Sequence, residues 1–238
     1  HDGLSADDLE GLGTHVAGTI AALCDDVTGC SGNADCPLQV WKVIDDRPLG
    51  DGRRYVAFAQ YLRALAAVET SGARVLNLSL GGTASSPTET RLFRRLREAD
   101  VFVVAAMGNE RELGDPVEYP AAYPGVHGVA AVDELDRDAP FSNTGRHAFL
   151  SAPGVHIVST VPTPGRSGPA FETCSGTSMA TPHVAAVAAL VRAPHPDWTV
   201  AQVAAHLAAT ARPAAGQRAG RRSQRFGHGI VNLAEALR

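Results

Sequence analysis

Short, uninterrupted apolar runs that alternate with helix-like segments constrain the fold of this chain more than any other feature. Residues 39–44 (QVWKVI), 74–80 (RVLNLSL) and 101–106 (VFVVAA) are rich in β-branched side chains, which is typical of strands buried on both faces. Residues 55–70 and 89–99 lie between these runs and carry apolar side chains at helical spacing. Alternating strands and helices predict an α/β fold with a parallel sheet.

The rest of the sequence continues this pattern. Residues 126–132 and 155–160 are further predicted strands, whereas residues 177–192 and 200–211 are predicted helices dense in Ala and Val. A short closing helix is predicted over residues 231–238. Since no internal repeat or composition shift divides the chain, we expect one domain over all 238 residues.

Charge and hydropathy argue against two classes of partner. The 21 basic and 25 acidic residues give a formal net charge of -4, so no overall positive field would draw the chain onto nucleic acid or an anionic membrane. No apolar run reaches the roughly 18 residues of a spanning helix. We therefore expect neither a nucleic-acid partner nor a membrane partner.

Three of the four cysteines, Cys24, Cys30 and Cys36, are crowded into one loop rich in Gly and Asp, and Cys174 is far away in sequence. A Cys24–Cys30 or a Cys30–Cys36 disulfide would fit a secreted protein, whereas a zinc site would favour a closer pair such as CxxC. We expect one loop disulfide in a secreted or extracellular chain.

Three motifs place polar residues where chemistry could occur. In residues 176–190 (GTSMATPHVAAVAAL), Ser178 falls in the first turn of an apolar helix, whose free N–H groups would stabilise an oxyanion. Asn109 follows the strand at 101–106 and offers an amide donor at the carboxyl end of that strand. His15 lies in the first turn of a third apolar segment (GLGTHVAGT). Taken singly, Ser178 could equally be a helix cap, whereas Gly-Asn after a strand is more often a simple turn and a lone His15 is more often a packed histidine.

In this order, and together with LNLSLGG at 76–82, the motifs resemble the subtilisin family of serine peptidases (subtilases, peptidase S8). SAPG at 151–154 and FGHGIVN at 226–232 are similar to further landmarks of that family. The resemblance implies a three-layer α/β/α sandwich with a mostly parallel central sheet. It also implies that Ser178 is the nucleophile of peptide-bond hydrolysis and that Asn109 is the oxyanion donor.

The chain departs from the family at two of the three triad positions. When the family string GHGTHVAGT is aligned on residues 11–19, Leu12 occupies the position of the triad histidine, and His15 matches a second, structural histidine. The strand that ends in the triad aspartate has no counterpart before Leu12. We therefore expect a domain without its first strand, whose exposed sheet edge an upstream segment or a partner chain could complete.

This departure decides the expected activity. Leucine cannot accept the hydroxyl proton, and a serine without a base is a poor nucleophile. In a well-studied member of this family, removing the triad serine or histidine lowers turnover by about 10⁶. We expect a serine endopeptidase domain that is catalytically impaired as written, so whether the chain is an active enzyme stays open. The alternative is a pseudopeptidase that acts as a peptide- or protein-binding module.

The resemblance also implies a substrate groove. Three residues would pair with an extended peptide: Ser79, Leu80 and Gly81. Four residues would line the first specificity pocket: Ala106, Gly108, Glu110 and Glu118. Because a carboxylate in such a pocket pairs with a cation, we expect a preference for Arg or Lys, although both acids could simply be solvated.

No cofactor or catalytic metal is implied. Structural Ca²⁺ is common in the family, and Asp25, Asp26 and Asn33 supply oxygen ligands, but their spacing fits no defined calcium loop. A structural calcium ion is therefore only an expectation from the resemblance.

Overall fold

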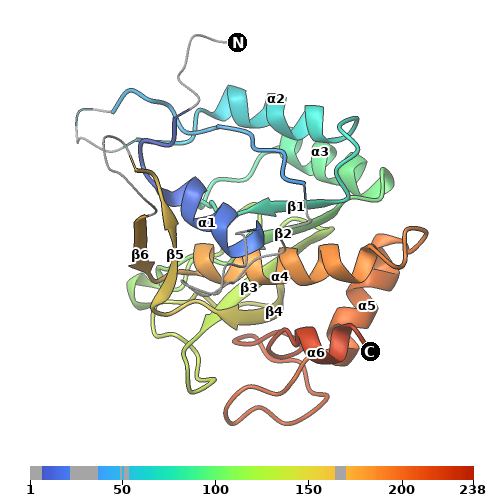
Figure 1. Ribbon diagram of the computed structural model, residues 1–238. Helices are drawn as coiled ribbons and strands as arrows, with labels where there is room; N and C mark the ends of the chain where they lie inside the picture. Colours follow the sequence, from blue (N-terminus) through green and yellow to red (C-terminus); the bar gives the residue numbers. More distant parts are fainter. Residues whose placement is uncertain (1–6, 22–36, 49, 51–53, 164–169) are drawn as a thin grey trace.

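The central sheet of the computed structural model is parallel throughout (Figure 1). The residues that the structure describes are 7–21, 37–48, 50, 54–163 and 170–238. The strands lie side by side in the order β1 (Val75–Leu78), β2 (Phe102–Ala106), β3 (Val126–Val132) and β4 (Ala148–Pro153). Two further strands, β5 (Ile157–Val161) and β6 (Ala170–Cys174), form an antiparallel pair apart from this sheet.

Helices cover both faces of the sheet. One face carries α2 (Phe58–Val68) and α3 (Pro87–Glu98), and the other carries α1 (Leu12–Ala21), α4 (Thr177–Arg192), α5 (Val200–Thr210) and α6 (Leu233–Ala236) (Figure 1). A separate hydrophobic core fills each interface between helices and sheet. The predicted three-layer α/β/α sandwich with a parallel sheet is therefore confirmed. None of the described helices is long and apolar enough to cross a bilayer.

The middle of the sheet shows why the apolar runs predicted strands. All five residues of β2 are buried, because helices cover this strand on both faces. An unbroken run of apolar residues is stable only in such a position, since a strand with one solvent-exposed face alternates polar and apolar residues. The predicted strand at 126–132 coincides with β3, and the predicted helix at 177–192 coincides with α4.

The predicted strand over residues 39–44 is wrong. Within this segment only Ile44 makes a β-bridge, an isolated one with Val56, and Val40 and Trp41 are exposed. A strand forms only when a neighbouring strand satisfies its backbone, and β1 is not hydrogen-bonded to this segment. Among the described residues, the segment therefore has the composition of a buried strand but only this one β-bridge.

Sequence reasoning also missed two strands and overestimated one helix. β4 contains a serine and a proline, and β6 has three exposed residues, so neither has the continuous apolar run used to predict strands. The closing helix is confined to α6, where the side chain of Asn232 accepts a hydrogen bond from the Glu235 N–H and caps the helix start.

A close backbone contact fixes the start of α4 against the sheet. Gly154 directly follows β4, and a Cβ atom at this residue would lie 2.6 Å from the Ala131 Cβ and 2.8 Å from the Gly176 carbonyl oxygen. The Gly154 carbonyl in turn accepts a hydrogen bond from the Gly176 N–H at 2.8 Å. Because only glycine allows this approach, residue 154 sets the position of the α4 amino end.

Candidate functional site

Ser178 lies in the first turn of α4, where the site begins. The helix runs for 16 residues from Thr177, after the N-cap residue Gly176. The first N–H groups of a helix have no intrahelical acceptor, and the helix dipole adds positive potential at this end. The Ser178 hydroxyl is half-buried in that environment, so an anion formed next to it would be stabilised.

The Asn109 carboxamide is fixed next to Ser178 through Thr177. Its Oδ1 accepts hydrogen bonds from the Thr177 N–H at 2.8 Å and from the Thr177 Oγ1 at 3.1 Å. Because these donors occupy the oxygen, the NH₂ half of the exposed carboxamide is the part that can donate to a ligand. Together with the amino end of α4, Asn109 thus forms an arrangement that can bind an oxyanion.

Gly108 brings the loop after β2 into this position. Its φ of +100° is a conformation that favours glycine, and a Cβ atom there would lie 2.3 Å from the Asn143 Nδ2 and 2.7 Å from the Glu118 Cδ. The Gly108 N–H donates to Thr177 Oγ1 at 3.2 Å. The loop is therefore held against α4 from one side and against two polar side chains from the other.

The Ser178 hydroxyl donates its hydrogen bond to a backbone carbonyl. The acceptor is the Ser79 carbonyl oxygen, 3.3 Å from Ser178 Oγ. Ser79 Oγ donates back to the Ser178 carbonyl at 2.7 Å and accepts from Asn77 Nδ2 at 3.0 Å. Among the residues that the structure describes, Ser178 Oγ has no hydrogen bond to an imidazole or a carboxylate. A peptide carbonyl cannot accept the proton at neutral pH, so this hydrogen bond does not activate the hydroxyl.

Two nearby histidines have structural contacts. His15 is buried in α1, and its Nε2 lies 3.0 Å from the Ile157 carbonyl and 3.2 Å from the Glu172 carbonyl, which ties α1 to β5 and β6. His183 lies within α4, its Nδ1 is 3.0 Å from the Met179 carbonyl, and burial lowers its pKa. Both rings are engaged by backbone groups.

Leu12 is the first residue of α1, and an aspartate organises this helix start. Asp8 Oδ1 accepts from the Gly11 N–H at 2.9 Å, and Asp8 Oδ2 accepts from the Thr14 N–H at 2.7 Å and from Thr14 Oγ1 at 2.8 Å. Partial burial would raise the pKa of Asp8, but these hydrogen bonds outweigh it and lower the pKa. Asp8, which is the carboxylate next nearest to Leu12 in sequence after Glu10, thus caps α1.

Glu110 and Glu118 form a carboxyl pair beside the oxyanion site. Glu118 is only 7% exposed, and burial together with its hydrogen bond to Glu110 raises its pKa to about 8. The same hydrogen bond lowers the pKa of Glu110, which also accepts from the Asn109 N–H at 2.6 Å. At neutral pH the pair therefore retains one proton, which sequence reasoning did not predict.

The structure brings most of the predicted groove residues together around this pair. A Cβ atom at Gly81 would lie 2.5 Å from Glu118 Oε2, so Glu118 contacts the loops after β1 and after β2. Ala106 is buried at the end of β2, and Leu80 instead lines a large cavity beside β1. Ser79 is held by the reciprocal hydrogen bonds with Ser178 described above.

Sequence reasoning missed Thr177 and Asn143 as parts of the site. Asn143 Oδ1 accepts from the Glu110 N–H at 2.8 Å, and its Nδ2 donates to the Pro116 carbonyl at 3.1 Å. The only signal for Thr177 was its position beside Ser178. Asn143 lies in an unremarkable Ser-Asn-Thr-Gly turn, so its role becomes visible only when the chain is folded.

The residues of the predicted loop disulfide and of the predicted calcium site lie outside the described residues. They are Cys24, Cys30 and Cys36 for the disulfide, and Asp25, Asp26 and Asn33 for the calcium ion. Both expectations stay predictions. Cys174, in β6, forms no disulfide with any residue that the structure describes. Within the described ranges, no group of three or more His, Cys, Asp or Glu side chains is placed to hold a metal ion.

Comparison with known proteins gives concordant results. A thermostable alkaline protease of Halalkalibacterium halodurans is 40% identical over 206 residues, which are 86% of this chain and 53% of that protein. Subtilisin BL of Lederbergia lenta is 36% identical over 234 residues, which are 98% of this chain and 80% of that protein. The chain thus spans about half the length of the first relative and four fifths of the second.

Solved structures agree with these sequence relatives. Fervidolysin from Fervidobacterium pennivorans, a keratinolytic enzyme related to subtilisin, superposes with a TM-score of 0.80 at 32% identity, over 95% of this chain and 36% of that chain. The model of the subtilase family matches residues 2–229, a range that contains Leu12, Asn109 and Ser178. The chain therefore belongs to the subtilase family and is a homologue of the subtilisin-like serine proteases.

Proposed function

We propose that this chain is a subtilisin-like serine endopeptidase domain whose hydrolytic step is impaired because none of the described residues serves Ser178 as a base. The observation that carries the proposal is the hydrogen bond from Ser178 Oγ to the Ser79 carbonyl, in a site where Asn109 is already fixed beside α4. Leu12 stands at the family position of the base. The machinery that stabilises the transition state is thus present, and the group that would activate the nucleophile is replaced.

The chemistry follows from these positions. Ser178 Oγ would attack the carbonyl carbon of an extended peptide, and the resulting oxyanion would accept hydrogen bonds from Asn109 and from the amino end of α4. The proton must leave Oγ as the new bond forms, and the Ser79 carbonyl cannot take it. In this family the oxyanion site and substrate binding alone retain roughly 10³ to 10⁴ of rate enhancement over water.

A second candidate function is peptide binding without cleavage. Two observations favour this function. Leu12 at the family position of the base would prevent cleavage, and the groove residues Ser79 to Gly81 and the carboxyl pair would still be placed to contact a peptide. As a binding module, the chain would hold an extended peptide along Ser79 to Gly81 and place a cationic side chain against Glu110 and Glu118. The expectations of secretion and of a structural calcium ion stay predictions.

Hydrolysis of a fluorogenic peptide by three purified proteins tests the first function: the unchanged chain, Ser178→Ala and Leu12→His. We expect the unchanged chain to be indistinguishable from Ser178→Ala. Leu12→His should gain at least about tenfold, and no more than a small part of full activity, because loss of the triad aspartate alone costs about 3 × 10⁴ in subtilisin. Efficient cleavage by the unchanged chain that Ser178→Ala abolishes would disprove the impairment.

Peptide binding tests the second function and its specificity. Peptides that differ only in Arg, Lys or Phe at the pocket position should bind the Ser178→Ala protein in the order Arg or Lys before Phe. Glu118→Gln should reduce this preference, whereas Glu112→Gln, at an exposed acid in the neighbouring turn, should leave it unchanged. Equal or tighter binding of the Phe peptide would show that the acid pair does not select cations.

A further inference from the structure

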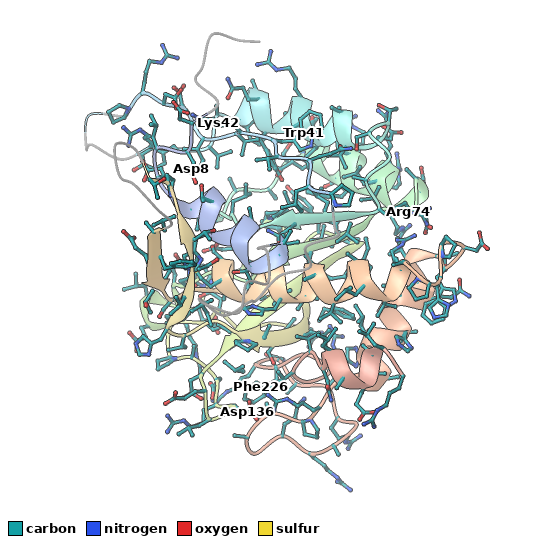
Figure 2. All side chains as sticks on the ribbon, in the orientation of Figure 1. Asp8, Trp41, Lys42, Arg74, Asp136 and Phe226 are labelled. Atoms are coloured by element: carbon teal, nitrogen blue, oxygen red, sulfur yellow. The ribbon has the colours of Figure 1, made fainter. Side chains whose placement is uncertain are left out.

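The loop between α5 and α6 carries a run of basic residues that is free of acidic ones. Residues 198–234 contain no aspartate or glutamate, although the whole chain has a net charge of -4. The arginines of this segment are Arg212, Arg218, Arg221, Arg222 and Arg225. Figure 1 shows the loop in orange-red, at the end of the molecule opposite α2. Phe226, which belongs to the loop, lies far from Trp41 in Figure 2. Positive charge is therefore concentrated at one end of the protein.

Buried contacts hold this loop in one conformation. Phe226 is only 6% exposed and belongs to a small hydrophobic cluster with Ile230. The Gln217 Nε2 donates hydrogen bonds to the Arg221 carbonyl at 2.9 Å and to the Gly227 carbonyl at 3.1 Å. The backbone that carries the arginines is thus fixed before any ligand arrives, which lowers the entropic cost of binding.

Arg146, from the loop before β4, lies against this basic loop. Arg222 Nη2 donates to the Arg146 carbonyl at 2.5 Å and to the Ala148 carbonyl at 3.0 Å, and both arginine side chains are exposed. The two loops therefore present their guanidinium groups together. We define the arginine surface by its five exposed members, which are Arg146, Arg218, Arg221, Arg222 and Arg225.

Most of the arginine surface has no acidic partner among the residues that the structure describes. Its one ion pair joins Arg225 to Asp138 at 3.4 Å, and Arg111 pairs with the same carboxylate oxygen at 2.5 Å. The neighbouring Asp133 and Asp136 are each paired with another arginine outside the surface. The positive charge of the surface is therefore not neutralised by the described part of the chain.

A second basic run, on α3, differs in this respect. Residues 91–97 contain four arginines, but Arg94 pairs with Glu98 and Arg95 pairs with Glu69. Acidic side chains are thus interleaved with the basic ones on α3. Because the two runs are similar in arginine content and differ in acidic neighbours, α3 provides a matched comparison for the arginine surface.

The chemistry of the arginine surface favours one class of partner. Guanidinium groups bind sulfate and phosphate groups through paired hydrogen bonds. Residues 211–230 expose no large hydrophobic side chain. The loop therefore offers no aromatic ring on which a nucleic-acid base could stack, and no apolar anchor for a bilayer or a protein partner. A highly polar polymer that carries anionic groups needs neither.

An acidic residue beside the surface favours a flexible polymer over a rigid one. The turn 133–137 contacts the basic loop where the Ala215 N–H donates to the Asp136 carbonyl at 2.9 Å. This turn exposes Glu134, which has no ion pair with a described residue. A rigid nucleic-acid duplex laid across the surface would bring phosphates towards Glu134, whereas a flexible chain can follow the arginines alone.

We propose that the arginine surface binds a flexible anionic polysaccharide through its sulfate or phosphate esters. The arginines supply charge-assisted hydrogen bonds to the ester oxygens, and the fixed loop presents them without further ordering. Sugar hydroxyl groups stay in water, so no apolar contact is required. The proposal is independent of whether Ser178 reacts.

Isothermal titration of dextran sulfate and of dextran phosphate of equal chain length into the unchanged chain tests the proposal. We expect saturable binding of at least one ester and no binding of unsubstituted dextran. The ester that binds more tightly identifies the anionic group. Because binding releases counterions from the polymer, the affinity should fall as salt is added.

Two double variants locate the binding site. Arg218→Gln with Arg221→Gln should weaken binding by at least about tenfold. It should also reduce the slope of log Kd against log salt concentration by about 2, since two charged contacts are lost. Arg91→Gln with Arg94→Gln removes the same charge from exposed positions of α3 and should change Kd by less than about twofold. Circular dichroism confirms that both proteins are folded.

Three outcomes would overturn the proposal. The first is the absence of saturable binding to both dextran esters. The second is an equal loss of affinity in the two double variants, which would show that only the net charge matters. The third is tighter binding of a DNA duplex or of polyglutamate than of either ester, since the surface would then serve a different class of partner.

Discussion

The two halves of this site differ in how completely they are built. On the nucleophile side, Asn109, Thr177 and Ser178 are held by short hydrogen bonds and by a glycine contact that leaves no room for a side chain. On the base side, Leu12 begins α1 beside a cavity, and the neighbouring segment 37–43 has no strand pairing. The difference teaches that the packing and hydrogen bonding around Ser178 do not depend on equally tight packing around Leu12.

The physical reason is that the halves depend on different parts of the chain. The nucleophile side is formed by α4 and by the loops that follow β2 and β4. β2 is paired on both sides, β4 pairs with β3, and α4 packs against the buried face of both strands. The base side depends on α1 and on the edge of β1. We therefore expect changes on the nucleophile side to affect the free energy of unfolding much more than changes around Leu12.

Matched glycine substitutions give the largest expected contrast between the halves. Gly154→Ala forces a methyl group to within 2.6 Å of the Ala131 Cβ and should lower the free energy of unfolding by about 3 kcal/mol. Gly13→Ala, in α1, meets its nearest atom, the Asp8 Oδ2, only at 3.4 Å and should raise it by about 0.5 kcal/mol. Urea unfolding measures both. Similar losses for the two variants would show that the base side is packed as tightly as the nucleophile side.

A smaller effect is expected from the cap of α1. Asp8→Ala removes the acceptor of the Thr14 and Gly11 N–H groups and should cost about 1 kcal/mol at neutral pH. Because the pKa of Asp8 is lowered in the folded chain, the stability that its carboxylate contributes is present above its ordinary pKa and is lost as the pH falls through the folded value. The difference in unfolding free energy between the unchanged chain and Asp8→Ala should therefore be smaller at about pH 3 than at about pH 7. Asp197→Ala, at an exposed acid, is the control.

The carboxyl pair should give a pH effect of opposite sign. The pKa of Glu118 is raised to about 8, so the folded chain binds more protons than the unfolded chain between about pH 4.5 and 8. Relative to Glu118→Gln, the unchanged chain should lose on the order of 1 kcal/mol of unfolding free energy across this window. The lowered pKa of Glu110 acts in the opposite direction and reduces this loss. Parallel curves for the two proteins would show that Glu118 is ionised at neutral pH.

The sequence predicted those parts of the molecule that a local pattern determines. β2, β3 and α4 were found because burial on both faces, or a helical apolar stripe, leaves a continuous signature. β4 and β6 were missed because Ser151, Pro153 and the exposed residues of β6 interrupt such runs. The error at 39–44 has the opposite cause, since a strand-like composition is not enough where none of the described strands pairs with the segment.

The candidate site was predictable to the same extent. Ser178 and Asn109 were identified from motifs, and the structure places both at the amino end of α4. The role of Asn143 and the raised pKa of Glu118 beside Glu110 were not predictable, because they arise from contacts between separate segments, 33 residues apart for Asn143 and Glu110, that meet only in the folded chain. The partner of the Ser178 hydroxyl likewise depends on tertiary geometry.

The pH dependence of fluorophosphonate labelling of Ser178 tests the central claim most directly, that no base reaches this hydroxyl. We predict that the unchanged chain is labelled slowly, at a rate that rises with hydroxide concentration and shows no inflection near the histidine pKa of about 6.5. Leu12→His should introduce that inflection. Rapid labelling of the unchanged chain, with an inflection between about pH 6 and 7, would mean that an imidazole already activates Ser178 and would contradict the account.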